Sequence, residues 1–76
     1  MNASKISVLA DELQALLEKL GYADNRLNGV RQRGNEVTFN VVTLYSDGEL
    51  REVIDFTYNS QLDNWSWNDH TRVNVA

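Results

Sequence analysis

His70 is the single histidine of the chain and the first residue to examine for catalysis. It stands in the sequence Asn68-Asp69-His70-Thr71, where Asp69 would have to orient the imidazole for acid–base work. Adjacent side chains on a strand point to opposite faces, so Asp69 is poorly placed for that role. No serine or threonine stands at the spacing of a recognised nucleophile motif. A surface histidine is the simpler interpretation, and we expect no catalytic residue here.

Two acidic groupings could supply oxygen ligands to a divalent cation: Asp63-Asn64 with Asp69, and Asp47 with Glu49. Neither has the alternating oxygens, central glycine and terminal glutamate of a calcium loop. The chain has no cysteine, so it has no thiolate metal site and no disulfide, and one histidine cannot form a zinc site by itself. We therefore expect no metal and no cofactor.

Pairs of inward-facing carboxylates carry acid–base chemistry in glycosidases, and Glu52 is the candidate acid of this kind. The hairpin register places Glu52 on the inner face opposite Thr43, and we expect its carboxylate to reach water at the sheet margin. A small hydrolase or isomerase with a pocket between helix and sheet is the enzymatic alternative. Once the aromatic side chains are placed, the core is too small to leave room for that pocket. We predict that the protein is not an enzyme.

Trp65 and Trp67 alternate with Ser66, as expected of a short strand whose indoles lie beside Phe56 and Tyr58. Aromatic side chains on one strand face can form a stacking platform for bases, but such platforms normally lie in a basic groove. Large aromatic residues also form the core of small domains and are enriched where proteins bind one another. The two indoles are therefore either core residues or contact residues, and the sequence leaves both interpretations open.

Size and charge limit the classes of function. The chain has 76 residues, which predicts a single domain over residues 1–76, and its net charge is −4 with a pI near 4.7. An acidic protein repels a phosphate backbone, so we expect no direct binding of nucleic acid. No apolar run reaches the roughly 18 residues of a membrane span, and no signal-peptide pattern is visible. We expect a soluble, cytoplasmic protein without membrane contact.

Residues 4–20 have the pattern of an amphipathic helix. Apolar residues follow the spacing that places them on one stripe: Ile6, Leu9, Ala10, Leu13, Leu16, Leu17 and Leu20. Ser4 or Asn2 can serve as the N-cap. Gly21 suits the left-handed position after the helix, and Tyr22 can fold back on the last turn. The stripe is wide enough to cover one face of a sheet, and it is short for a coiled coil.

Residues 36–45 and 49–58 form the clearest hairpin, because Ser46-Asp47-Gly48 lies between two alternating apolar runs. A turn at Asp47-Gly48 fixes the register. The inner face then contains four cross-strand pairs: Tyr45 with Leu50, Val41 with Ile54, Phe39 with Phe56, and Val37 with Tyr58. The outer face contains four others: Leu44 with Arg51, Val42 with Val53, Asn40 with Asp55, and Thr38 with Thr57.

Weaker strands flank this hairpin at residues 26–33 and 64–69. Gly34-Asn35 suits a second two-residue turn, and a tight turn there places Leu27 opposite Val42. A bulge at Gly29 would instead move Leu27 to the inner face, and the sequence does not decide between the two. Residues 68–76 either fray or add an edge strand. The fold class is α+β: one N-terminal amphipathic helix packed on a three- to four-stranded antiparallel β-meander.

The outer face of this sheet gives the functional hypothesis. Val42, Leu44 and Val53, with Leu27 in one register, form an apolar stripe where a single-layer sheet should be polar. Exposed apolar patches usually mark contact surfaces. We predict a non-enzymatic protein-interaction module that acts as a homodimer or in a complex with another protein. It would use this face or a free strand edge, with Arg51 and Asp55 as polar partners and Trp65 and Trp67 as further contacts.

A second hypothesis is an acidic inhibitor of the phage or plasmid type, such as an immunity, antitoxin, anti-restriction or anti-CRISPR protein. Acidic residues gather in two groups that could block a basic target surface: Asp11, Glu12 and Glu18 in one, and Asp47, Glu49 and Glu52 in the other. Binding of this kind weakens steeply with added salt.

Overall fold

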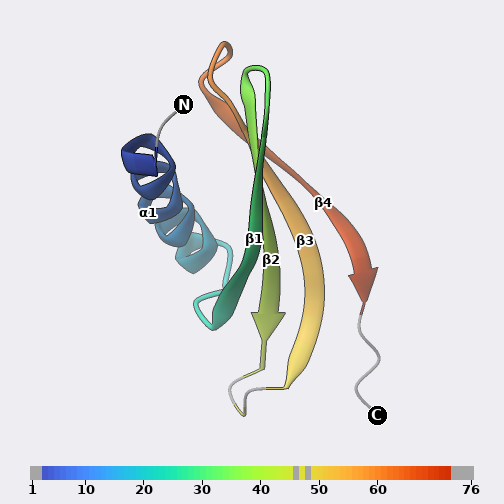
Figure 1. Cartoon of the computed structure of the whole chain (residues 1–76). Helices are drawn as coiled ribbons and strands as arrows, with labels where there is room; N and C mark the ends of the chain where they lie inside the picture. The colour runs from blue at the N-terminus through green and yellow to red at the C-terminus, as the bar shows by residue number, and fades with distance from the viewer. Residues whose placement is uncertain (1–2, 46, 48, 73–76) are drawn as a thin grey trace.

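The computed structural model describes residues 3–45, 47 and 49–72, and in this part of the chain one helix precedes a four-stranded sheet (Figure 1). The bounds are α1 (Ala3–Lys19), β1 (Asn25–Arg33), β2 (Glu36–Leu44), β3 (Leu50–Asn59) and β4 (Asn64–Arg72). Every neighbouring pair is antiparallel and the spatial order is β1-β2-β3-β4. The predicted α+β meander is confirmed, with four strands.

Helix α1 ends as its sequence predicts. The Gly21 N–H donates to the Glu18 carbonyl at 3.1 Å and the Tyr22 N–H to the Leu17 carbonyl at 2.7 Å, which is the Schellman pattern. Gly21 has φ 88°, a conformation that a side chain would disfavour. The Tyr22 ring packs against the core, as expected. These bonds fix the direction in which the chain leaves the helix.

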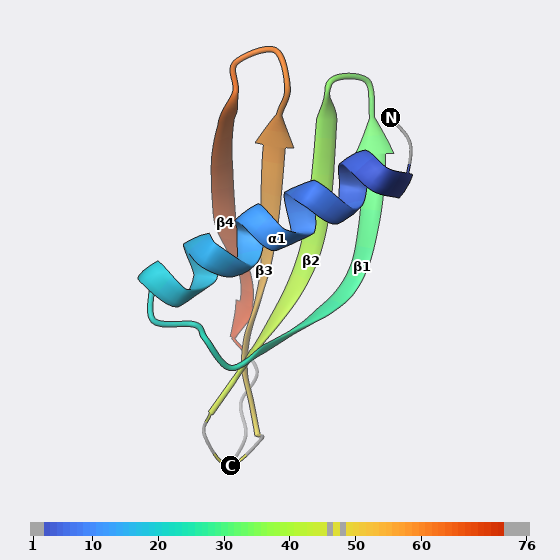
Figure 2. The same cartoon turned by 90° about the vertical axis from the view of Figure 1, so that its left-hand side faces the viewer.

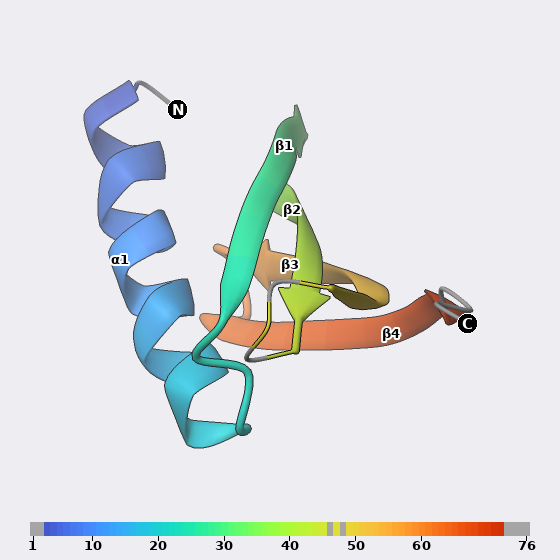
Figure 3. The same cartoon turned by 90° about the horizontal axis from the view of Figure 1, so that it is seen from below.

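The core lies between one stripe of α1 and one face of the sheet. Its buried members are Leu9, Leu13, Leu17, Val37, Phe39, Val41, Ile54 and Phe56. The helix crosses this face obliquely, from the β1 side at its N-terminal end to beyond β4 at its C-terminal end (Figure 2). The view along the strands shows α1 on one side of a strongly twisted sheet (Figure 3). In the described part of the chain, no helix covers the other sheet face.

The β1–β2 hairpin turns at Gly34-Asn35, with Arg33 opposite Glu36, as predicted. Of the two registers that the sequence allowed, the bulged one is present. The pairing shifts between Leu27 and Gly29, so that Leu27 lies opposite Val41 and packs against the core. Leu27 therefore does not belong to the outer face.

The β2–β3 register is as predicted from Val37 opposite Tyr58 to Thr43 opposite Glu52, and then departs from prediction. Leu44 lies opposite Leu50, not Arg51, and the Tyr45 N–H donates to the Glu49 carbonyl, so Tyr45 does not pair with Leu50.

The reason for this shift lies in the side chain of Asp47, whose Oδ1 accepts the Glu49 N–H at 3.0 Å. This Asx-type bond makes Glu49 the first paired residue after the turn. The strand then has one residue too many, which it takes up as a bulge around Arg51. Ser46 and Gly48 lie outside the described residues.

The two hairpin tips at the upper end of the sheet in Figure 1 are joined by hydrogen bonds. The Asn35 carbonyl accepts the Ser60 N–H at 2.8 Å and the Ser60 hydroxyl at 3.1 Å. The loop between β3 and β4 closes on the Asn59 side chain, which accepts the N–H groups of Gln61 and Leu62. β4 continues to Arg72, three residues beyond the predicted 64–69, so the chain extends the edge strand here. Residues 73–76 of the predicted tail lie outside the described residues.

Candidate functional site

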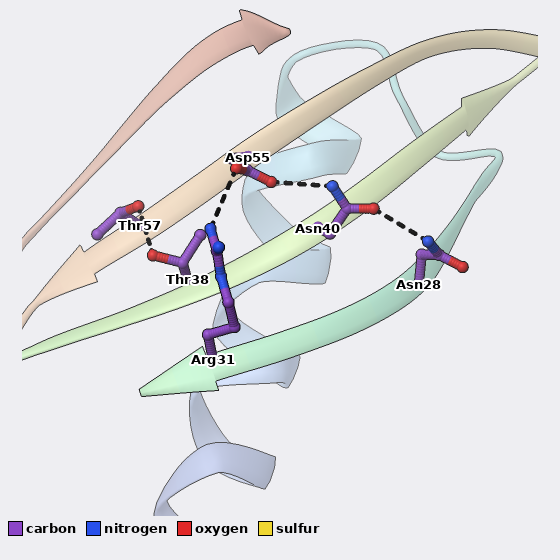
Figure 4. A network of polar contacts seen from close by, with 6 residues as sticks. All are labelled: Asn28, Arg31, Thr38, Asn40, Asp55 and Thr57. Atoms are coloured by element: carbon purple, nitrogen blue, oxygen red, sulfur yellow. Dashed lines mark hydrogen bonds and ion pairs between the residues drawn. The ribbon is translucent and has the colours of Figure 1, made fainter. Parts of the chain in front are cut away.

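The outer sheet face is dominated by a network of polar side chains (Figure 4). The Asn28 Nδ2 donates to Asn40 Oδ1 at 3.2 Å, and the Asn40 Nδ2 donates to Asp55 Oδ1 at 2.9 Å. The second Asp55 oxygen lies 3.5 Å from a guanidinium nitrogen of Arg31. Each of β1, β2 and β3 contributes to this chain of contacts, so the polar groups satisfy one another across three strands.

The bulge in β1 makes this face hollow. Gly29 lies opposite Asn40 and has no side chain to fill the space, which leaves a hollow of about 460 Å³ lined by Asn28, Gly29, Val30, Arg31, Thr38, Asn40 and Asp55. The Arg31 side chain is 77% exposed and that of Asp55 is 17% exposed, so their ion pair lies at the rim. Most of the residues that line the hollow are polar, and Asn28, Asn40 and Asp55 among them bond to one another.

The apolar stripe expected on this face offers little area. Val42 is only 5% exposed, because it lies on an inner strand between Arg26 of β1 and Val53 of β3. Leu44 and Val53 are partly buried. The expected exposure of Val42 is therefore wrong. Asp55, the expected polar partner at its rim, is engaged with Arg31 and Asn40, and the side chain of Arg51 lies outside the described residues.

Glu52 is buried and does not reach water at the sheet margin as the sequence suggested. It is 6% exposed and lies opposite Thr43 on the inner face. The Thr43 hydroxyl accepts the Glu52 N–H at 3.1 Å and donates to the Glu52 carbonyl at 3.3 Å. A buried Glu52 cannot join Asp47 and Glu49 in an exposed acidic group, so that part of the inhibitor hypothesis is wrong.

The aromatic side chains of β4 face the helix side of the sheet. The Trp65 ring lies 6.0 Å from the Phe39 ring and 5.3 Å from the Tyr58 ring, and the Trp67 ring lies 5.4 Å from that of Phe56. Trp65 packs against the core, whereas Trp67 is 43% exposed. The sequence left open whether the two indoles are core residues or contact residues, and the structure separates them. Trp65 is a core residue, and Trp67 is a large apolar side chain at the surface.

A groove runs between α1 and β4 beside Trp65. It has a volume of about 330 Å³ and is lined by Glu12, Ala15, Leu16, Lys19 and Trp65. Its floor is apolar, because Ala15, Leu16 and the indole contribute it. The groove is also bordered by one acidic side chain, Glu12, and one basic side chain, Lys19. The last turn of α1 projects past β4, so this groove opens onto the edge of the sheet (Figure 2).

Glu12 lines the groove seven residues before Lys19 on α1, and its negative charge contributes to the electrostatics of Tyr58 on β3. The Tyr58 hydroxyl donates a hydrogen bond to the carboxylate of Asp63. This bond, then desolvation and the negative charges of Asp63 and Glu12 raise the pKa of Tyr58 above the ordinary 10.0. Lys19 is the last residue of α1 and lies at the projecting end of the helix, on the open side of the groove.

The two edges of the described sheet differ in charge. β1 bears three exposed arginines, Arg26, Arg31 and Arg33, and charged side chains on an edge discourage pairing with another strand. β4 has no charged residue from Asn64 to Asn68, and it pairs with β3 alone in the described sheet. The charged residues of β4, Asp69 and Arg72, lie towards its C-terminal end, so the less protected stretch of edge is Asn64 to Asn68.

The candidate metal and catalytic residues do not come together. Among the residues that the structure describes, no group of three or more His, Cys, Asp or Glu side chains could hold a metal ion. Asp63 is bonded to Tyr58, and the side chains of Asp69 and His70 lie outside the described residues. In the same part of the chain, no helix is long and apolar enough to cross a membrane.

Comparison of the chain with protein-family models, with curated proteins and with solved structures gives no match. The geometry must therefore be interpreted by itself.

Sequence reasoning named Trp65 and Trp67 but missed the groove residues on the helix. The helical spacing places Leu16 on the apolar stripe and leaves Glu12 and Lys19 off it. The groove arises because α1 crosses β4 obliquely and extends past it, and a helical repeat contains no information on that angle. A signal was available in the alternation of β4, which predicts that its indoles share a face with the helix.

Proposed function

We propose that this protein is a non-enzymatic interaction module that binds another polypeptide through β4 and the adjoining end of α1. The observation that carries the proposal is the Trp67 side chain, 43% exposed on an edge strand without charged residues between Asn64 and Asn68. Exposed tryptophan is frequent at the energetic centre of protein interfaces, since its burial removes a large apolar area from water.

The alternative surface on the outer face supports the proposal less well. Its polar groups, from Asn28 to Asp55, bond to one another, and a partner would have to break those bonds to engage them. Val42 has almost no area to contribute. The partner is either a second copy of the chain or a different protein, and both belong to the same class of function.

A photo-crosslinking amino acid at position 67 tests the proposal in the cells from which the protein derives. The matched control carries the same amino acid at Val8, which is 56% exposed on α1 away from β4. Sedimentation from micromolar to millimolar concentration measures self-association in parallel. We expect a discrete crosslinked species, or a dimer, that depends on position 67 and is missing from the Val8 control. A monomer that forms no adduct specific to position 67 would overturn the proposal.

A further inference from the structure

We infer that the partner binds as an extended segment, adding a fifth strand beside β4 and inserting an apolar side chain under the projecting end of α1. This inference rests on the proposed function, and it names the chemistry of the partner: a segment with an apolar residue and an acidic residue at alternate positions. The occupant is a different polypeptide and not a second copy of this chain.

The backbone of β4 selects an extended ligand. On an edge strand, alternate N–H and C=O groups point away from the sheet, and another strand is the backbone shape that meets such a row. β4 spans nine residues and pairs with β3 alone in the described sheet. Charged side chains on an edge strand disfavour pairing with a further strand, and β1 has three exposed arginines of this kind. The segment from Asn64 to Asn68 in β4 has no charged residue.

The groove supplies the side-chain specificity. A strand beside β4 directs alternate side chains towards the helix side of the sheet, where Ala15, Leu16 and Trp65 form an apolar floor. The last turn of α1 lies over this position because it projects past β4 (Figure 2). One apolar side chain of the added strand therefore becomes enclosed between helix and indole, while a neighbouring one covers Trp67.

Charge completes the match. Of the two ionic residues that line the groove, Glu12 comes seven residues before Lys19 on α1, and so lies further from the end of the helix that projects past β4. Lys19 lies on the turn that projects over the open edge, and its ammonium group favours a carboxylate on the incoming segment. Side chains on the same face of a strand are two residues apart. The acidic residue of the incoming segment is therefore expected two residues from the apolar residue that enters the groove.

A second copy fits this edge less well. If β4 paired with β4 of a second copy about a two-fold axis, the last turn of each α1 would lie over the β4 strand of the other copy. The two projecting turns would then approach each other on the same face of the joined sheet.

The test selects short random peptides from a display library on the immobilised full chain and titrates the selected peptides by NMR. We expect peptides with apolar and acidic residues at alternate positions, with amide shifts concentrated in β4 and around Leu16. Peptide nitrogens that point towards β4 alternate with nitrogens that point away from it. Methylation of a nitrogen of the first kind should weaken binding about tenfold, as loss of one backbone hydrogen bond predicts, and methylation of a nitrogen of the second kind should leave binding unchanged. Lys19→Glu should change the selected acidic residue to a basic one, and the control Lys5→Glu should not.

The inference is overturned if no peptide binds, if binding is insensitive to nitrogen methylation, or if the shifts map to the outer face around Asn40. A dimer that protects the β4 amides and excludes the peptides would also overturn it, but would leave the proposed function standing. The proposed function fails separately, through the absence of contacts at position 67.

Discussion

The Tyr58 hydroxyl donates a hydrogen bond to the carboxylate of Asp63, five residues further along the β3–β4 hairpin. Asp63 is held at φ 52°, a left-handed conformation that aspartate tolerates better than most residues. The bond closes the loop that precedes β4 and so fixes where the aromatic edge strand begins. It also makes the loop sensitive to alkaline pH, because a phenolate cannot donate.

The first prediction concerns this pH dependence. The pKa of Tyr58 is raised in the folded chain above 10.0, first by its bond to Asp63. The folded state therefore holds the phenol proton more tightly, so the stabilisation is complete below pH 10 and is lost as pH rises through the folded-state pKa. Ultraviolet titration of phenolate should show late ionisation of Tyr58, which Asp63→Asn moves to lower pH. An unchanged titration curve in Asp63→Asn would contradict the assignment.

The parts of the fold that the sequence predicts are those set by local chemistry. Gly21 and Gly34 occupy positions of positive φ, which glycine favours. The end of the helix and the first hairpin turn can therefore be predicted from residue type. Alternation gives the pairing from Val37 to Thr43, because a slip by one residue would expose the whole apolar set. These are short-range constraints that the chain itself carries.

What escapes prediction depends on side-chain bonds and on packing angles. A single Asx-type bond from Asp47 shifts the last pairs of β2 and β3 and creates the bulge at Arg51. The burial of Val42 follows from its neighbours on two other strands. The groove at Leu16 follows from the direction of α1 across the sheet. None of these is a property of one segment, so pattern analysis of segments misses them.

The second prediction concerns the link between helix and sheet. The Asn25 side chain exchanges hydrogen bonds with Gln14 at 2.9 and 3.1 Å and donates to the Tyr22 carbonyl at 2.8 Å. Asn25→Ala should lower the free energy of unfolding by about 1–3 kcal/mol, because a partly buried carbonyl loses its donor. Urea unfolding followed by circular dichroism measures the loss. Gln32→Ala, at an exposed site on the same strand, is the control and should change stability by less than about 0.5 kcal/mol.

The third prediction separates the two indoles. Trp65 contacts the rings of Phe39 and Tyr58, so Trp65→Ala should cost about 2–4 kcal/mol of folding free energy. Trp67→Ala should cost about 1 kcal/mol, since Trp67 contacts Phe56 from a position where it remains 43% exposed. Thermal and urea unfolding give both values. Iodide should quench fluorescence strongly in Trp65→Phe and weakly in Trp67→Phe, and the reverse order would contradict the division between core and surface.

The fourth prediction concerns the buried hydroxyl of Thr43, which is bonded to both backbone groups of Glu52. Thr43→Val keeps the shape but leaves a buried N–H without its acceptor, so it should destabilise the chain by about 1–3 kcal/mol. Thr57→Val is the matched control. Its hydroxyl bonds to that of Thr38 at 2.9 Å on the partly exposed outer face, where water can replace the bond. That change should cost under about 1 kcal/mol. Equal losses in the two variants would show that the Thr43 hydroxyl does not hold β2 to β3 at this point, and hydrogen exchange of the Glu52 amide reports the same contact directly.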